Sequence, residues 1–206
     1  MKEGNKNYTE AGRKQWCCEN PGQVVATIAQ VQWCTGTEDA LNEMQNDRSA
    51  LQSWKDQNDV QLRSLTELVR SNLTDLERCI IVALITTDVH ARDIVEELRR
   101  DNVDSAYDFN WQKQLRYYFD GSEGPDGAVY IKQIQAVLPY GLEYMGATSR
   151  LVITPLTDRC WITISGALHI KLGANPSGPA GTGKTESTKD LAKAIACLCI
   201  VFNCSD

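Results

Sequence analysis

The sequence lacks the features of a membrane-spanning, secreted or nucleic-acid-binding protein. Its longest apolar run, Cys79–Ile85, is well short of the roughly 20 residues that a helix needs to cross a bilayer. The first residues are polar and contain no apolar core of a signal peptide. Acidic residues outnumber basic ones by 27 to 21, and the two kinds are interleaved, so no basic face for phosphate backbones is expected. We therefore expect an intracellular chain with no membrane and no nucleic-acid partner.

The spacing of metal-binding residues is also missing. None of the eight cysteines forms a CxxC pair, and the two histidines, His90 and His169, are not at zinc-finger spacing. Cys197, Cys199 and Cys204 come nearest to a metal cluster, but their segment is more typical of a buried helix end and a strand. The cysteines are therefore predicted to be free thiols in a reducing compartment.

The composition is that of a folded chain with one domain or two small ones. Hydrophobic residues make up 42% of the 206 positions and charged residues 23%. Residues 1–20 are polar and aperiodic, and we expect a loose or truncated start there. Helical spacing of apolar residues then dominates residues 21–140. Turn-forming Pro139, Gly141 and Gly146 predict a domain boundary, after which the pattern changes.

The helical part begins after a Pro-Gly turn. Apolar residues on one face predict a helix over Gln23–Trp33. A longer helix is expected to follow, with Thr37 as its N-cap. The polar run Asp56–Asp59 interrupts its apolar stripe, so a bend or break is predicted at that point.

A further helix is predicted over Leu76–Leu98. Thr74 is expected to cap it, with Glu77 as the partner in a capping box. The apolar run Cys79–Ile85 could instead be a buried strand, but the helical periodicity continues on both sides of the run, which favours the helix.

The rest of the chain is predicted to mix strands and helices. Ala128–Leu138 alternates weakly, as a strand does, and Leu151–Pro155 is a short extended segment. A helix is expected from Thr157 to Leu168, capped by Thr157 or Asp158.

One motif carries recognisable chemistry. The pattern G-x-x-x-x-G-K-[ST] is matched without exception. Its glycines let the backbone aim several N–H groups at an anion, and the following helix adds its positive N-terminal dipole. Lys184 would reach the β- and γ-phosphates of ATP, and the Thr185 hydroxyl would bind Mg²⁺. The predicted phosphate-binding residues are Gly178, Pro179, Ala180, Gly181, Thr182, Gly183, Lys184 and Thr185.

The surroundings of the motif mostly agree with a phosphate loop. A helix over Thr185–Cys197 and an apolar strand over Cys199–Asn203 are predicted to follow it. The segment before it, Leu172–Ser177, is not the apolar strand that usually precedes such a loop. The alternative is a glycine-rich surface loop with an accidental Lys-Thr. At average residue frequencies the four fixed positions coincide in roughly one chain of this length in a hundred, which disfavours that alternative.

Binding does not imply turnover. Hydrolysis also needs an acidic pair on a later strand to hold Mg²⁺ and activate water, and no such pair follows the loop in this sequence. Glu96 and Glu97 lie on a predicted helix surface and are expected to be solvated charges. We therefore assign no catalytic residue.

Several segments resemble dynein heavy chains, with a leaning to the axonemal branch. Those that resemble the first AAA+ module are Leu151–Cys160, Gly178–Thr185, Thr188–Ala194 and Val201–Asp206. Those that resemble the C-terminal part of the linker, a helical lever, are Pro21–Val25, Ala83–Asp93 and Tyr140–Gly146. The resemblance covers nearly everything after about residue 20.

The resemblance implies a fold and a set of roles. The fold class is mixed α and α/β: a mainly helical linker segment at residues 21–140, followed at residues 141–206 by the incomplete β-α-β start of an AAA+ P-loop NTPase fold. Val152 and Pro155 would give adenine apolar contact, with Thr154 as a nearby polar group; from the residues alone they read as a buried edge segment.

The resemblance also implies a setting. The cofactors would be ATP and Mg²⁺. The partners would be the remainder of the heavy chain with its AAA+ ring, dynein intermediate and light chains and, through the parent protein, microtubules of the ciliary axoneme. The 206 residues alone are expected not to hydrolyse ATP at a useful rate. The rival readings are a self-contained phosphate-loop enzyme, such as a small kinase, and a non-enzymatic helical interaction module.

Overall fold

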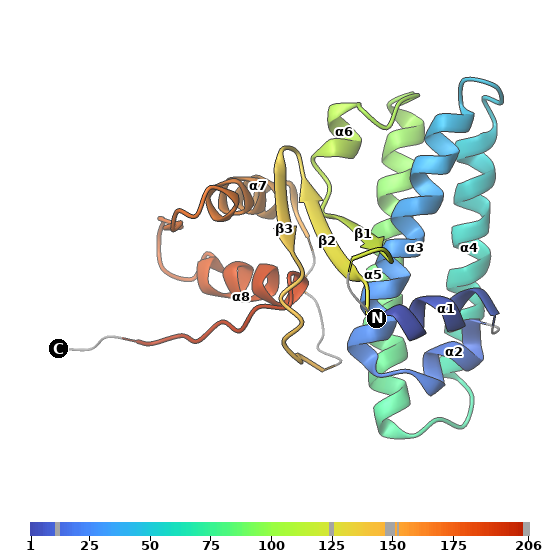
Figure 1. Ribbon diagram of the computed structural model, residues 1–206, viewed down its shortest axis with the longest axis horizontal. Coiled ribbons are helices and arrows are strands. Elements are labelled where there is room, and N and C mark those ends of the chain that lie inside the picture. Colours follow the sequence, from blue (N-terminus) through green and yellow to red (C-terminus); the bar gives the residue numbers. More distant parts are fainter. Residues whose placement is uncertain (11–12, 124–125, 147–150, 152, 204–206) are drawn as a thin grey trace.

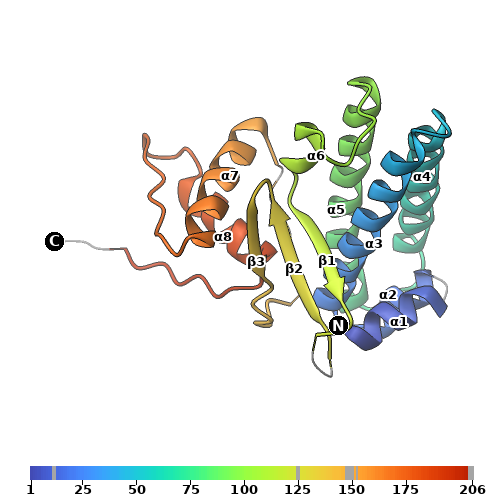
Figure 2. The same cartoon turned by 45° about the horizontal axis from the view of Figure 1, so that its top comes forward.

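The protein has helices on both sides of a small central sheet. The computed structural model describes residues 1–10, 13–123, 126–146, 151 and 153–203. Figures 1 and 2 show the sheet between a group of long helices and the pair α7 and α8. The helices are α1 (Lys2–Glu10), α2 (Arg13–Glu19), α3 (Gly22–Glu43), α4 (Ala50–Val69), α5 (Asp75–Arg100), α6 (Phe109–Gln112), α7 (Pro155–His169) and α8 (Lys184–Ala194). The strands are β1 (Arg116–Asp120), β2 (Ala128–Gln133) and β3 (Ala136–Pro139).

Two hydrophobic clusters hold the layers together. The larger one joins α3 and α5 to the sheet and to α7 and α8, through side chains such as Trp33, Trp111 and Trp161. The smaller one lies where α1 and α2 cross the ends of the long helices, around Trp16 and Ile81. None of the described helices is long and apolar enough to cross a membrane.

Residues 2–10 and 13–19 are helical, so the expectation of a loose start was wrong. Trp16 is fully buried, packs edge-on against Tyr8 and donates its indole N–H to the carbonyl of Gly4 at 2.9 Å. Arg13 donates to Asp88 of α5 at 2.7 Å and to Gln61 of α4. Long-range contacts of this kind order a segment whose own periodicity is weak.

The predicted helix break at Thr37 was also wrong, because α3 is one continuous helix. Thr37 is fully buried, and its hydroxyl donates to the carbonyl of Trp33 at 2.8 Å and accepts from the indole of Trp54 at 3.0 Å. A threonine whose hydroxyl bonds the preceding turn fits inside a helix, so it need not start one.

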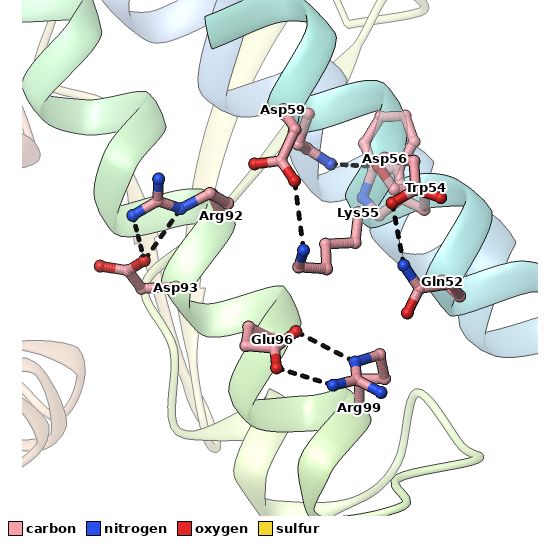
Figure 3. Close-up of polar contacts among 10 residues, drawn as sticks. Gln52, Trp54, Lys55, Asp56, Asp59, Arg92, Asp93, Glu96 and Arg99 are labelled. Atoms are coloured by element: carbon pink, nitrogen blue, oxygen red, sulfur yellow. Dashed lines mark hydrogen bonds and ion pairs between the residues drawn. The ribbon is translucent and has the colours of Figure 1, made fainter.

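Helix α4 runs straight through Asp56–Asp59, where a bend was predicted. The chain turns earlier, between Met44 and Ser49. The polar run lies on a face whose charges are paired: Lys55 binds Asp59 at 3.1 Å and Gln52 donates to Asp56 at 2.8 Å, as Figure 3 shows. Pairs four residues apart support a helix, so the polar run continues it.

Helix α5 confirms the prediction for its start and its type. Thr74 accepts from the Glu77 N–H at 3.3 Å, and the Glu77 carboxylate accepts from the Thr74 N–H at 2.8 Å. The run Cys79–Ile85 is helical rather than extended. Both ends of the capping box are satisfied, which stabilises the first turn.

The sheet is an antiparallel meander of β1, β2 and β3. Its register pairs Tyr118 with Tyr130 and Ile131 with Leu138. The single strand predicted over Ala128–Leu138 is two strands, since the chain reverses at Ile134, whose φ is 53°. The strand β1 was not predicted, because its aromatic residues sit in a charged setting. The sequence therefore predicted the region of β2 and β3 but neither the turn between them nor β1.

The part after the sheet has two helices and no described strand. Thr154 caps α7 by accepting from the Thr157 N–H at 3.3 Å, so neither Thr157 nor Asp158 is the cap. The strand predicted over Cys199–Asn203 is not formed: its Phe202 side chain is 83% exposed and the segment pairs with no other described strand. An isolated apolar strand has nothing to satisfy its backbone groups, so the run stays irregular.

Two glycines in helices should respond to alanine in opposite ways. A Cβ at Gly36 in α3 would lie 2.3 Å from the Trp54 ring, whereas a Cβ at Gly166 in α7 would meet nothing within 4 Å. We expect Gly36→Ala to destabilise the fold by about 1–3 kcal/mol through overpacking. We expect Gly166→Ala to stabilise it by about 0.5–1 kcal/mol through helix propensity. Urea unfolding of both variants measures this, and an equal response would contradict the packing of Trp54.

Candidate nucleotide-binding site

The phosphate-binding motif forms an exposed loop that leads directly into α8. Gly181 and Gly183 adopt φ values of 77° and 76°, in the left-handed region that favours glycine. Gly183 is the residue before the helix and Lys184 is its first residue. The two glycines therefore turn the chain into the helix where the motif requires it.

The N-terminus of α8 has free hydrogen-bonding capacity. The first N–H groups of any helix have no partner within the helix. Gly183 has no side chain to cap them, and no side-chain cap is made. Such N–H groups, with the positive end of the helix dipole, make a site suited to phosphate oxygens.

Lys184 is folded into the loop. Its ammonium group donates to the carbonyl of Gly178 at 2.9 Å, to the carbonyl of Pro179 and to the hydroxyl of Thr182 at 3.3 Å. The Thr182 hydroxyl in turn donates to Pro179 at 2.9 Å. The loop thus places a positive charge on its inner side, beside the start of α8. Thr185, the predicted Mg²⁺ ligand, follows in the first turn of the helix and is exposed.

The segment with the predicted adenine-side residues lies next to α7 and α8. Val152 falls outside the described residues, so its place is not given by the structure. Thr154 is exposed and caps α7, and Pro155 is the first residue of that helix. Leu151 donates its N–H to the Asp190 carboxylate of α8 at 3.4 Å. The structure therefore joins this segment to the helix that carries the phosphate loop.

A cavity of about 360 Å³ is lined in part by this segment. Leu151 and Ile153 line it together with Trp33 of α3 and Trp161 of α7, whereas Thr154 and Pro155 do not. Asp158 also lines the cavity, and burial raises the pKa of its carboxyl group. Of the described residues with a predicted adenine contact, neither Thr154 nor Pro155 therefore reaches this cavity.

The C-terminal end of α8 is held by the sheet region, which sequence reasoning did not foresee. Helices end with carbonyl groups that lack helical partners. Three successive carbonyls at this end, of Ala194, Ile195 and Ala196, accept from the Tyr117 hydroxyl at 3.0 Å, the Gly141 N–H at 2.8 Å and the Glu143 N–H at 3.2 Å. The end of the helix is therefore fixed to β1 and to the irregular segment that follows β3.

Gln23, at the start of α3, holds the same segment from the other side. Its amide nitrogen donates to the Tyr140 hydroxyl at 2.9 Å and to the Glu143 carbonyl at 2.7 Å, and its oxygen accepts from the Met145 N–H at 2.6 Å. The sequence alone does not show that Gln23 is buried, because its hydrogen-bond partners are more than 110 positions away in the chain. We call residues 140–145 the connecting segment, because they contact both α3 and α8.

The sequence of the chain is similar to known proteins of one family. A family model described as the hydrolytic ATP binding site of the dynein motor region matches residues 140–206. Dynein axonemal heavy chain 6 of Homo sapiens is 50% identical over 97% of this chain and 5% of its own length. Dynein axonemal heavy chain 1 of Homo sapiens is 48% identical over 97% of this chain and 4% of its own. For the dynein-1-beta heavy chain, flagellar inner arm I1 complex, of Chlamydomonas reinhardtii, the identity is 46% over 94% of this chain and 4% of its own.

The chain belongs to the dynein heavy chains. The match runs over nearly all of its 206 residues, which confirms the resemblance seen in the sequence. The chain spans about a twentieth of the length of these relatives. Within this dynein segment, the part matched by the ATP-binding family model begins at the connecting segment and includes the loop and α8.

Acidic and cysteine residues that the sequence analysis considered for catalysis or metal binding lie on the surface or in the core of this dynein segment. Glu96 binds Arg99 at 2.7 Å on the surface of α5, which agrees with a solvated charge (Figure 3). Across the described residues no group of three His, Cys, Asp or Glu side chains could hold a metal ion. Burial raises the pKa of the Cys34 thiol to about 12, so this thiol stays protonated as part of the core. Cys204, one of the three clustered cysteines, lies outside the described residues.

Removal of the Gln23 amide should loosen the connecting segment. Gln23→Leu leaves the part-buried N–H of Met145 and carbonyl of Glu143 without their partner, so we expect a loss of about 1–2 kcal/mol in the free energy of unfolding. The control is Gln52→Leu, which removes only an exposed hydrogen bond to Asp56 and should change stability by less than about 0.5 kcal/mol. Urea unfolding gives the energies. Amide hydrogen exchange should also become faster at residues 143–146 in the Gln23 variant alone, and unchanged exchange there would contradict the assignment.

Proposed function

We propose that this chain binds MgATP as the part of an axonemal-type dynein heavy chain that joins the C-terminal linker to the first AAA+ module. The observation that carries the proposal is the position of Lys184. Its ammonium group lies inside a glycine-rich loop, next to the uncapped N-terminus of α8. The family match to a hydrolytic ATP binding site over residues 140–206 supports ATP as the ligand.

Each residue of the loop has a proposed role. Phosphate oxygens replace the loop carbonyls as acceptors for Lys184, which then bridges the β- and γ-phosphates. Thr185 supplies its hydroxyl to Mg²⁺. The backbone N–H groups from Gly178 to Thr185 surround the phosphates. On the adenine side, Val152 and Pro155 give apolar contact and Thr154 a polar group.

We assign residues 21–140 to the linker and residues 141–206 to the ATP module. The start of the family match at residue 140 supports this boundary. So does the position of the sheet, which packs against the long helices through β1 and against α7 through β3. The connecting segment is then the place where the two parts meet.

The wider role follows from the relatives. They are named as axonemal and flagellar dynein heavy chains, so we propose that the chain serves a microtubule-based motor that powers ciliary or flagellar movement. Its proposed partners are the remainder of the heavy chain with its AAA+ ring, the intermediate and light chains, and microtubules reached through the parent protein. Its proposed location is the axoneme within the cytoplasmic cytoskeleton.

Nucleotide binding is tested by one lysine substitution and a matched control. We expect the parent chain to bind a fluorescent ATP analogue with Mg²⁺ saturably, and Lys184→Ala to weaken binding at least about tenfold because the phosphate charge loses its partner. Lys189→Ala is the control: it lies on the same helix, and its ion pair is with Glu186. Equal binding by all three proteins would overturn the proposal. Absence of binding with intact helical structure would favour a helical interaction module.

Hydrolysis by the 206 residues alone is not expected. Glu186, the acid nearest in sequence to the loop, pairs with Lys189 at 2.8 Å on the surface of α8, so we assign it no role in activating water. We therefore expect no steady release of inorganic phosphate from ATP by the pure chain. Release that Lys184→Ala abolishes would contradict this, and transfer of phosphate to an added small-molecule acceptor would favour a kinase.

A further inference from the structure

We infer that the cavity of about 360 Å³ lined by α3, α5 and α7 is a binding site for a small aromatic amine, with Asp158 as the acceptor of the ammonium group. The site is separate from the proposed nucleotide site. None of residues 178–185, all of which the structure describes, lines the cavity. The inference therefore goes beyond the proposed function and does not depend on it.

The size of the cavity sets the size of the ligand. Ligand pockets of proteins usually have volumes of about 300–1,000 Å³, so this cavity is at the small end of the range. An apolar cavity of about 150 Å³ is large enough to hold one benzene molecule. The cavity therefore has room for one or two rings with a short side chain.

The walls of the cavity suit an aromatic ring that carries a positive charge. Trp33 of α3 and Trp161 of α7 both line it, and Val89 of α5 adds an aliphatic surface. Tryptophan rings give a large apolar contact area, and their faces also attract cations. The ring of the ligand would pack against these side chains, which a purely polar ion could not do.

The charge of the cavity is negative and uncompensated. Asp158 lines it and is only half-buried, so a ligand can reach it. Asp93 lines it as well, but its carboxylate already binds Arg92 at 2.6 Å. Of the described residues that line the cavity, none is a lysine or an arginine. The cavity therefore offers one carboxylate and no side chain of fixed positive charge to match it.

The carboxylate of Asp158 lacks a partner of its own. It makes no hydrogen bond or ion pair with any residue that the structure describes. Burial raises its pKa, and Lys113 opposes this only in part; the ammonium of Lys113 donates to Asn110 at 3.4 Å and does not line the cavity. A carboxylate that is partly removed from water gains from a charged donor. An ammonium group in the cavity would be such a donor.

Two glutamines add further acceptors to the same cavity. Gln114 is 6% exposed, and its amide nitrogen donates to the carbonyl of Asn110 at 3.1 Å. Its oxygen accepts no hydrogen bond within the described parts of the chain. The amide of Gln30 also lines the cavity and has no hydrogen-bond partner among the described residues. An ammonium group has three N–H donors, so oxygens beyond the single carboxylate suit it.

The experiment compares two ligands that differ in one group. 2-Phenylethylamine and 2-phenylethanol have the same ring and side-chain length, but only the amine is charged at neutral pH. Ligand-observed NMR titration measures their affinities for the full 206-residue chain. We expect the amine to bind about tenfold more tightly than the alcohol, because only the amine forms a charge-assisted bond with Asp158.

Asp158→Asn tests the proposed acceptor. It should lower the affinity for the amine about tenfold, to that of the alcohol, and leave the affinity for the alcohol within about twofold. Glu97→Gln is the control, because it removes the same charge from a residue that acts on Asp158 but does not line the cavity. The control should keep the affinity for the amine within about twofold of the parent.

A pair of valine substitutions on α5 tests the location. Val89 lines the cavity, so Val89→Phe should fill part of it and weaken both ligands at least about tenfold. Val82 lies on the same helix, is 48% exposed and does not line the cavity, so Val82→Phe should change neither affinity. These variants also decide the question if Asp158→Asn does not fold.

Four results would each overturn the inference. They are equal affinities of the parent for the amine and the alcohol, amine binding that Asp158→Asn leaves unchanged, binding that Val89→Phe leaves unchanged, and no saturable binding at about 5 mM ligand. Lys184→Ala should leave amine binding as it is in the parent. Failure of ATP binding and failure of amine binding are therefore distinguishable.

Discussion

The structure depends on the way the C-terminal end of α8 is held. A helix that carries a phosphate loop at its start is useful only if its other end is fixed, since a loose helix would let the loop drift. Three carbonyls at that end accept bonds from Tyr117, Gly141 and Glu143, and the same connecting segment is held by the amide of Gln23. Backbone groups that would otherwise lack partners thus connect the end of α8 to β1, α3 and the segment between them.

This joint explains the contrast between the two ends of α8. The loop is exposed and held mainly by its own contacts, such as those of Lys184, so it can exchange a carbonyl for another oxygen at little cost. The far end contains the buried residues Leu191, Ala194 and Ala196 and is tied to the sheet. A ligand therefore meets an exposed loop on a firmly anchored helix, an arrangement that suits binding without large rearrangement.

How much of this the sequence could predict depended on the range of the interactions. The loop motif and the capping box of Thr74 and Glu77 are local, so they were identified directly. The prediction that Thr37 starts a helix failed because its hydroxyl forms hydrogen bonds with the carbonyl of Trp33 and the indole of the distant Trp54, inside a continuous helix. The Cys199–Asn203 run has strand composition, but a strand needs a partner that periodicity cannot supply. The hydrogen bond between Leu151 and Asp190 could not be predicted for the same reason, since the two residues are 39 positions apart in the chain.

The connecting segment also has a mechanical consequence. It contacts α3 at Gln23 and Thr27, near the first turns of a helix of 22 residues that is about 33 Å long. A push applied near one end of a long rod is magnified at the other. A tilt of about 5° at Gln23 would carry Glu43 through about 3 Å, given the rise of an α-helix. The hydrogen bonds of the connecting segment thus join the C-terminal end of α8 to the first turns of this long helix, where a small tilt becomes a large displacement at the other end.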